Sequence, residues 1–371
     1  MSLKTSDQNS EVDYDIMIVG GGPSGISTWL HLHKYNTELA SKTILIEKEK
    51  YPRDKLCGGA IGSWGQDILK QLDINPAVPF IKIKNTEYRF GKDTFCNKEP
   101  GFLKIFRRIE FDHSLAKSAV SRGLQLNQNE IIQEMSHIKS RLMVKTNRKK
   151  YLVKTLVGAD GALSMVRRRM DLAIKPRFAT GIEIFAPVNP RYDTEFADST
   201  AVLDFTSINN GLQGYVWHFP CIKDNEPSMN HGIYDSRIIT EKPRADIKKI
   251  LTYELQSRNI NCQPSHWSGH PIPWLGKKST LSQPNIILVG DAAGIEPLLG
   301  GGIHLALSYG DVAALSILDA FNSNDFTFTS YREQLQTHIV GKYINKLTYL
   351  AHEVYSEKMN ILDAIKKILK K

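Results

Sequence analysis

The 371-residue sequence lacks several features that would define its class at once. Its four cysteines are scattered, without a CxxC pair or the Cys and His spacing of a metal site: Cys57, Cys96, Cys221 and Cys262. We therefore expect neither a metal site nor a disulfide framework, and the pattern fits a reducing compartment. The polar start, MSLKTSDQNSEVD, has no apolar signal core, and no apolar run reaches the roughly 18 residues of a membrane span. These absences predict a cytoplasmic protein without a transmembrane helix.

The basic composition does not indicate nucleic-acid binding. The net charge is +9 and the isoelectric point about 9.1. However, no basic stripe alternates with aromatic residues and no binding motif is present. Anionic cofactor phosphates or an anionic membrane surface would account better for the excess charge, and lysines that only solvate the surface are the simpler alternative. A hydrophobic content of 41% is typical of a folded globular chain, here long enough for two domains.

The stretch DIMIVGGGPSG, residues 15–25, carries the strongest local pattern. Apolar strand-like residues lead into Gly20, Gly22 and Gly25 and then into a helix-like run. In a dinucleotide-binding βαβ unit such glycines allow a tight turn, close approach to a pyrophosphate and close packing of helix on strand. A second strand ends in Glu47, which can accept hydrogen bonds from adenosine ribose hydroxyls. We expect a dinucleotide site whose pyrophosphate lies on the helix N-terminus, with further contacts from Pro23, Ser24 and Lys48.

The order of the other elements predicts an α/β protein with two interleaved domains. The glycine-rich, charged segment 48–65 should be a loop, and residues 82–95 a β-hairpin that turns near Gly91. Helices are expected over residues 23–35, 111–122 and 302–322, and strand patterns dominate from Pro176 to Asp235. We expect a dinucleotide-binding domain of residues 12–80, 100–175 and 282–322, a β-rich substrate domain of residues 81–99 and 176–281, and C-terminal helices over residues 323–371.

Three separated stretches together resemble the FAD fingerprints of para-hydroxybenzoate-hydroxylase-like flavoproteins: VGGGPSG at 19–25, GADGALSMVRR at 158–168 and LVGDAAGIEPLLGGGIHLAL at 288–307. Two more are similar to motifs of the geranylgeranyl reductase family of prenyl-lipid reductases: YPRDKLCGG at 51–59 and GYVWHFP at 214–220. The resemblance implies a Rossmann-like FAD-binding domain, an inserted β-rich substrate domain and C-terminal helices. Because a second glycine fingerprint is missing, the external donor, NAD(P)H or a reduced ferredoxin-like carrier, would bind transiently.

The resemblance also implies individual FAD contacts. Asp291 would accept hydrogen bonds from the ribitol, and Asp160 would lie near the pyrophosphate, although Asp before a helical run is also a good N-cap. The helix that starts at Gly302 would lie beside the flavin pyrimidine, where its dipole would stabilise negative charge on the reduced ring. Arg107 is the alternative to Arg108 as a phosphate or adenosine contact. The implied contacts are Arg53, Cys57, Gly58, Gly59, Arg108, Asp160, Gly161, Ser164, Arg167, Gly290, Asp291, Gly300, Gly301, Gly302 and Ile303.

The same resemblance places candidate catalytic and substrate residues. Cys57 would lie over the flavin, either as a proton donor or as a small residue that lines the pocket. His304, on the helix facing the flavin, is a further candidate for a proton relay. Tyr215, Trp217 and Phe219 would share one face of a strand and suit an apolar prenyl chain, although aromatic residues also alternate in ordinary sheet cores.

We therefore expect an FAD-dependent oxidoreductase that reduces alkene bonds of a prenyl or other apolar lipid substrate by hydride transfer from reduced flavin. The alternatives are a single-component aromatic monooxygenase and, third, a non-catalytic FAD-binding protein. The partner is expected to be a small-molecule or lipid substrate, and the oligomeric state is open. The C-terminal stretch KMNILDAIKKILKK has helical apolar spacing with lysines between, so it fits either a helix packed on the body or peripheral contact with the cytoplasmic face of a membrane.

Overall fold

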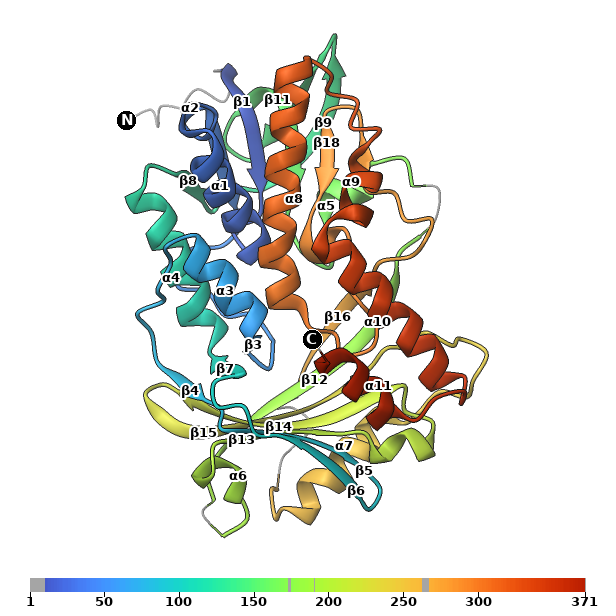
Figure 1. Ribbon diagram of the computed structural model, residues 1–371. Coiled ribbons are helices and arrows are strands. Elements are labelled where there is room, and N and C mark those ends of the chain that lie inside the picture. Colours follow the sequence, from blue (N-terminus) through green and yellow to red (C-terminus); the bar gives the residue numbers. More distant parts are fainter. Residues whose placement is uncertain (1–10, 173–174, 190, 262–266, 371) are drawn as a thin grey trace, which may run out of the picture.

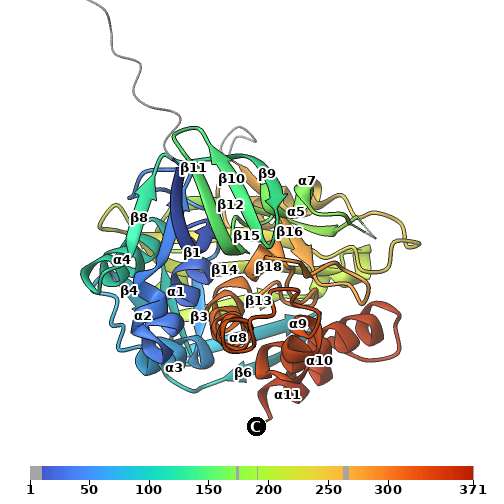
Figure 2. The same cartoon turned by 90° about the horizontal axis from the view of Figure 1, so that it is seen from above.

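The structure, a computed structural model, describes residues 11–172, 175–189, 191–261 and 267–370. One sheet stands upright in the upper half of the molecule, and a second sheet lies across the lower half (Figure 1). Helices cover the upright sheet, and the C-terminal helices run down one side to the second sheet (Figures 1 and 2). The predicted α/β class is confirmed.

The first sheet is built on parallel strands in the order β18, β11, β1, β2, β8. These strands are β1 (Glu11–Val19), β2 (Thr43–Glu47), β8 (Gln125–Gln128), β11 (Lys150–Gly158) and β18 (Ile286–Leu288). Antiparallel additions are β9 (Ile132–Ile138) and β10 (Arg141–Thr146) beside β11, and β17 (Ser282–Gln283) beside β18. Every residue of β2 is buried, as expected of a parallel strand covered on both faces.

The second sheet has the strand order β16, β12, β15, β14, β13, β5, β6. Its members are β5 (Asn85–Phe90), β6 (Asp93–Asn97), β12 (Arg177–Pro187), β13 (Thr200–Asp204), β14 (Gly214–Lys223), β15 (Glu226–Asp235) and β16 (Ser268–Trp274). The predicted hairpin is β5 and β6, and it joins the later strands through a parallel pairing of β5 with β13. We keep the proposed division into domains as a prediction.

A small third sheet corrects the loop that was expected over residues 48–65. It consists of β3 (Ala60–Gly62), β7 (Leu103–Phe106) and β4 (Phe80–Lys82). Ala60 pairs with Ile105, so the end of the expected loop is a strand, and a helix begins at Ser63. The glycines around Ala60 hide this strand from local patterns, because only the distant partner stabilises it.

The helices fall into groups around the two sheets. Over the first sheet lie α1 (Pro23–Tyr35), α2 (Thr37–Ser41), α3 (Ser63–Gln71), α4 (Arg108–Ser121), α5 (Met165–Arg169) and α8 (Gly302–Ser323). Below the second sheet lie α6 (Thr194–Ala197) and α7 (Ile247–Ser257), and the chain ends in α9 (Tyr331–Thr337), α10 (Ile339–Tyr355) and α11 (Ile361–Leu369). Single 3₁₀ turns are η1 (Thr206–Asn210) and η3 (Gly290–Ala292).

Helix α8 is the core helix of the molecule. It packs against α1 at Gly310, where a Cβ would lie 2.4 Å from Oγ of Ser27. By length and composition alone, α8 would be apolar enough to cross a membrane, but 72% of its most apolar window is buried inside the protein. It therefore resembles the buried helix of a globular core.

The C-terminal helix α11 packs on the body of the protein. Ile361, Leu362 and Ile365 are 2%, 7% and 1% exposed and belong to the core between α10 and the second sheet. Of the two interpretations of residues 358–371, the structure shows the packed helix. Its apolar face is therefore covered by protein, and contact with a membrane remains a prediction.

Candidate functional site

The carboxyl ends of the central parallel strands meet at one edge of the first sheet. Val19 of β1 pairs with Ile46 of β2 and Gly158 of β11, and Gly158 pairs with Leu288 of β18. The chain order reverses here, because β2 and β11 lie on opposite sides of β1. Ligands of open α/β sheets bind in the crevice outside such a point. The predicted cofactor segments follow directly at residues 20–25, 47, 159–161 and 289–291.

The glycines of the first motif have two different roles: some allow close packing of the backbone, and one lines the cavity. Gly20 has φ +106°, and a Cβ there would lie 2.4 Å from the carbonyl oxygen of Ala159. A Cβ on Gly25 would lie 2.0 Å from the carbonyl oxygen of Gly20. Gly22 instead lines the cavity, and within the described part of the chain no atom lies within 4 Å of a Cβ built there. Its bare backbone therefore fits the pyrophosphate of FAD.

Glu47 ends β2 beside this turn. Its carboxylate is 4% exposed and accepts hydrogen bonds from the backbone N–H of Gly21 at 2.7 Å and of Glu49 at 3.1 Å. The next residue, Lys48, is mostly exposed and pairs with Glu49 at 3.4 Å. Glu47 thus holds the turn in shape, and its contact with the ribose stays a prediction, as does that of Lys48.

Two of the predicted arginines share one buried carboxylate. Arg108 donates from Nε and Nη2 to Asp112, both at 2.7 Å, and Arg53 donates to Asp112 at 2.9 Å. Burial opposes the charge of Arg108, but Asp112 and the nearby Cys57 raise its pKa overall. Arg108 lines the cavity beside Cys57, whereas Arg107 lies over the ring of Phe185 at 4.1 Å. The structure therefore places Arg108 toward the cysteine loop.

Asp160 binds the first turn of helix α5. Its Oδ2 accepts hydrogen bonds from the N–H of Met165 at 2.5 Å and Val166 at 3.1 Å, and Ser164 Oγ donates to Oδ1 at 2.5 Å. The N-cap residue itself is Ser164, whose Oγ accepts the N–H of Arg167 at 2.9 Å, so Asp160 and Ser164 together hold the start of this helix. Arg167 donates to the carbonyl oxygens of Ala292 and Asp291, at 2.8 and 3.3 Å, and so fixes α5 to η3.

Asp291 lines the cavity and pairs with a lysine that sequence reasoning missed. Lys55 Nζ lies 3.2 Å from Asp291 Oδ2. Burial alone would raise the pKa of Asp291, but the charges of Lys55, His270 and Arg108 lower it overall. The signal for Lys55 was its place within YPRDKLCGG, where only the arginine, the cysteine and the glycines were singled out. Gly290, just before Asp291, allows close packing, because a Cβ would lie 2.6 Å from Ser24 Oγ.

Cys57 is tied to the second sheet by a chain of hydrogen bonds. Its backbone N–H donates to Glu183 Oε1 at 3.1 Å, and Asn230 Nδ2 donates to Glu183 Oε2 at 3.1 Å. Trp217 Nε1 donates to Asn230 Oδ1 at 2.8 Å. Glu183 is buried, and this burial raises its pKa. Sequence reasoning missed Glu183 and Asn230, which connect the candidate proton donor to the aromatic wall.

The aromatic residues of β14 form one wall of the cavity, as predicted. Tyr215, Trp217 and Phe219 are 8%, 8% and 5% exposed and all line the cavity. The Tyr215 hydroxyl donates to the carbonyl oxygen of Leu299 at 2.6 Å. His218 lies on the other face, where its Nδ1 is 2.7 Å from Nδ1 of His231. The strand therefore separates the aromatic cavity wall from an interior in which this histidine pair lies beside the apolar core around Val216.

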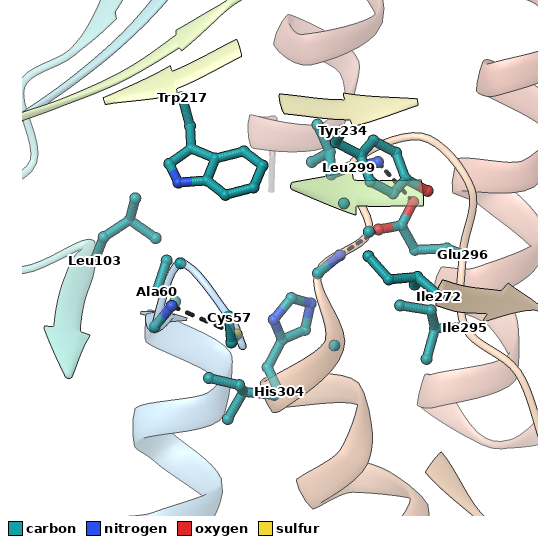
Figure 3. Close-up of a pocket in the computed structure, with 18 of the residues that line it drawn as sticks. Cys57, Ala60, Leu103, Trp217, Tyr234, Ile272, Ile295, Glu296, Leu299 and His304 are labelled. Carbon is teal, nitrogen blue, oxygen red and sulfur yellow. Dashed lines mark hydrogen bonds between the residues drawn. The ribbon is translucent and has the colours of Figure 1, made fainter. Parts of the chain in front are cut away.

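The start of α8 closes the cavity opposite this wall. Figure 3 shows His304 at the helix start, Cys57 on the neighbouring loop, Glu296 on the segment before the helix and Trp217 across the cavity. Burial lowers the pKa of His304 to about 4, so its ring is neutral at pH 7. Glu296 Oε1 accepts the N–H of Gly301, the residue that caps α8, at 2.8 Å. The expected stabilisation of negative charge on the flavin by this helix start stays a prediction.

A continuous cavity of about 810 Å³ joins these parts. The predicted residues that line it are Gly22, Pro23, Ser24, Cys57, Gly58, Gly59, Arg108, Gly161, Tyr215, Trp217, Phe219, Asp291, Gly300, Gly301, Gly302, Ile303 and His304. The remaining predicted residues are not among its lining: Gly20, Gly25, Glu47, Lys48, Arg53, Asp160, Ser164, Arg167 and Gly290. At its other end the cavity is lined by Tyr88, Phe95, Leu103 and the last turn of α11.

Fold and site together define a flavoprotein. The FAD binding domain family matches residues 13–316, and the chain belongs to this family of FAD-dependent oxidoreductases. The open backbone at Gly22 and Gly161 and the carboxylate of Asp291 are the kinds of group that FAD phosphates and ribitol hydroxyls require. These cavity residues would hold the cofactor.

Similar proteins narrow the class further. The chain is 26% identical over 327 residues to a digeranylgeranylglycerophospholipid reductase of Methanococcus aeolicus, covering 84% of this chain and 78% of the relative. A geranylgeranyl bacteriochlorophyll reductase-like structure from Thermoplasma acidophilum has a TM-score of 0.73 at 22% identity over 98% and 97% of the two chains. A probable FAD-dependent monooxygenase from Pseudomonas aeruginosa has a TM-score of 0.69 at 14% identity over 94% and 98%. The resemblance to geranylgeranyl reductases is confirmed, and the fold is shared with monooxygenases.

Proposed function

We propose that this flavoprotein reduces an alkene bond in a prenyl or similar apolar lipid chain. The observation that carries the proposal is the continuous cavity, which runs from the glycines and Asp291 of the cofactor segments to the aromatic wall of β14. Reduced FAD, when bound, supplies the hydride. The wall of Tyr215, Trp217 and Phe219 would hold the apolar chain and exclude water from it.

Cys57 is our proposed proton donor to the second alkene carbon. It lines the cavity, and its loop is held by Glu183 through a hydrogen bond of 3.1 Å to the Cys57 backbone N–H. Because His304 is neutral at pH 7, it can relay a proton only as a neutral imidazole and does not store one as a cation. Cys57 would then be reprotonated from solvent after each turnover.

The far rim of the cavity supports a substrate with a polar, anionic end. Lys366 and Lys370 line this rim together with Ile368 and Leu369 of the last turn of α11. An apolar tunnel with a cationic mouth suits a lipid whose chain enters first. Peripheral contact with the cytoplasmic face of a membrane would deliver such a lipid, and NAD(P)H or a reduced ferredoxin-like carrier would deliver electrons.

The second candidate is a single-component aromatic monooxygenase, favoured by the shared fold of the Pseudomonas aeruginosa structure. That chemistry needs a pocket for a compact ring and consumes oxygen. The tunnel beyond Trp217 toward Phe95 and Leu103 favours an elongated substrate instead. A non-catalytic FAD-binding protein is the third possibility.

An anaerobic turnover experiment decides between them. The FAD-loaded protein is reduced with dithionite and mixed with geranylgeranyl lipids that carry either a phosphate or a free hydroxyl group. We expect saturated lipid by mass spectrometry and reoxidised flavin in matching amounts. Flavin that stays reduced, together with oxygen-dependent hydroxylation of phenols in air, would contradict the proposal.

A further inference from the structure

Glu296 is a buried carboxylate at the start of α8 that the proposed chemistry has not used. It lines the cavity and its side chain is 0% exposed. Oε2 accepts hydrogen bonds from the N–H of Leu298 at 2.7 Å and Leu299 at 2.9 Å, and Oε1 accepts from Gly301 at 2.8 Å. The carboxylate therefore binds the backbone of the loop that leads into the helix (Figure 3).

The geometry favours the ionised form of Glu296. Both oxygens accept backbone N–H groups, whereas a protonated carboxyl would need an acceptor for its own proton. Burial raises the pKa of Glu296 overall, because it outweighs the opposing effect of the backbone N–H donors. Among the residues that the structure describes, no lysine, arginine or histidine forms an ion pair with it. In the ionised form that this geometry favours, the charge is compensated by the backbone amides.

The carboxylate of Glu296 lies at the helix start that was expected to favour an anionic flavin ring. A unit charge within about 10 Å of a group changes the equilibrium constant for charging that group by roughly tenfold, at an effective dielectric constant of about 20. A carboxylate bound at the positive end of α8 cancels much of the favourable dipole. A cancelled dipole would make the reduced flavin a stronger hydride donor, which would serve the proposed reaction.

We propose that Glu296 is a positioning residue that fixes the loop before α8 and lowers the reduction potential of the bound flavin by placing a buried negative charge beside it. The inference rests on the placement of the flavin ring at this loop, as in the proposed function. It does not depend on the identity of the lipid. Failure of the alkene assay alone would leave it standing, because the potential is measured without substrate.

The test compares the midpoint potential of the FAD-loaded protein with that of Glu296→Gln and Glu296→Ala by spectroelectrochemistry. Loss of the charge should favour reduction by at least tenfold in the equilibrium constant, a shift of about +30 mV for a two-electron couple. Glu99→Gln is the matched control, because Glu99 also lines the cavity but is exposed to solvent. The control should leave the potential unchanged. An unchanged potential in Glu296→Gln, or an equal shift in Glu99→Gln, overturns the proposal.

A second measurement needs no variant. Sulfite adds to oxidised flavin to give an anionic adduct, so a negative charge near the ring opposes its formation. We expect the wild-type flavin to bind sulfite no more tightly than free FAD does. The loss of visible flavin absorbance measures this binding. Tighter binding by the wild-type protein overturns the proposal even if both variants fail to retain FAD.

Discussion

Gly20 and Gly22 are two residues apart, yet their surroundings separate folding from cofactor binding. A Cβ at Gly20 meets the Ala159 carbonyl oxygen at 2.4 Å with φ +106°, whereas the described protein leaves open space at Gly22. We predict that Gly20→Ala lowers the free energy of unfolding by about 2 kcal/mol or more. Gly22→Ala should cost less than about 1 kcal/mol but weaken FAD binding at least tenfold. Urea unfolding of the apo-protein and titration of FAD fluorescence measure the two effects. Equal loss of stability in both variants would contradict this assignment.

Cys57 offers the sharpest chemical test at the residue scale. Removal of a proton donor typically costs about a hundredfold or more in rate. We therefore expect Cys57→Ala to lose at least that much turnover in the anaerobic assay, with FAD affinity within about threefold of the wild type. Cys57→Ser, which keeps a small donor, should retain part of the rate. Full turnover in Cys57→Ala would assign the residue to pocket lining.

The residues that sequence reasoning missed are single polar groups inside apolar stretches. Glu183 interrupts FATGIEIFAPV, and Glu296 interrupts the apolar run between Ile295 and Leu299. A buried charge in such a stretch is a usable signal, because it is costly unless it is hydrogen-bonded. The partners of Glu183 could not be predicted from the sequence, since the Cys57 N–H reaches it from a distant loop and Asn230 through the pairing of β15 with β12.

At the scale of elements, Asp311 connects three helices. Its carboxylate on α8 accepts hydrogen bonds from the Tyr35 hydroxyl at the end of α1 at 2.6 Å and from His338 before α10 at 3.3 Å. Burial would raise the pKa of Asp311, but these hydrogen bonds lower it to about 2. A lowered pKa means that the carboxylate stabilises the fold above about pH 4 and loses this effect between about pH 4 and pH 2.

We predict that Asp311→Asn is less stable than the wild type by about 1–2 kcal/mol at pH 7. The difference should shrink as the pH falls through 4 toward 2. Urea unfolding at pH 7, 5 and 3 measures it. Tyr35→Phe keeps the carboxylate but removes one donor, so its deficit should show a weaker pH dependence. A deficit for Asp311→Asn that grows toward low pH would be incompatible with this reading.

Much of the element order could be predicted because its signals are local. The apolar strand, the glycine turn and the helix start of the first unit lie next to one another in the sequence, so α1 has the predicted bounds and β2 ends at Glu47 as predicted. The strand β3 could not be predicted, because its pairing of Ala60 with Ile105 exists only in the folded protein. The meeting of the aromatic wall with Cys57 depends on the same kind of long-range contact.

At the scale of the whole molecule, the rim of the cavity should sort substrates by charge. Lys366 and its neighbour Lys367 are both exposed, but only Lys366 lines the cavity. We predict that Lys366→Glu raises KM for a phosphate-bearing prenyl lipid by about threefold to fivefold. The KM for the corresponding prenyl alcohol should not change. Lys367→Glu controls for net charge. An equal rise in KM in both variants would show that Lys366 does not recognise the phosphate headgroup.

The parallel pairing of β5 with β13 has a consequence for the newly made chain. Asn85 and Thr200, which pair across these strands, are 115 residues apart. At typical rates of synthesis the β5–β6 hairpin therefore waits on the order of ten seconds for its neighbour to leave the ribosome. The first sheet waits longer, because β11 gains β18 only at residues 286–288. The second sheet gains its last strand, β16, only at residues 268–274, so both sheets carry open edges until late in synthesis and are exposed to aggregation until then.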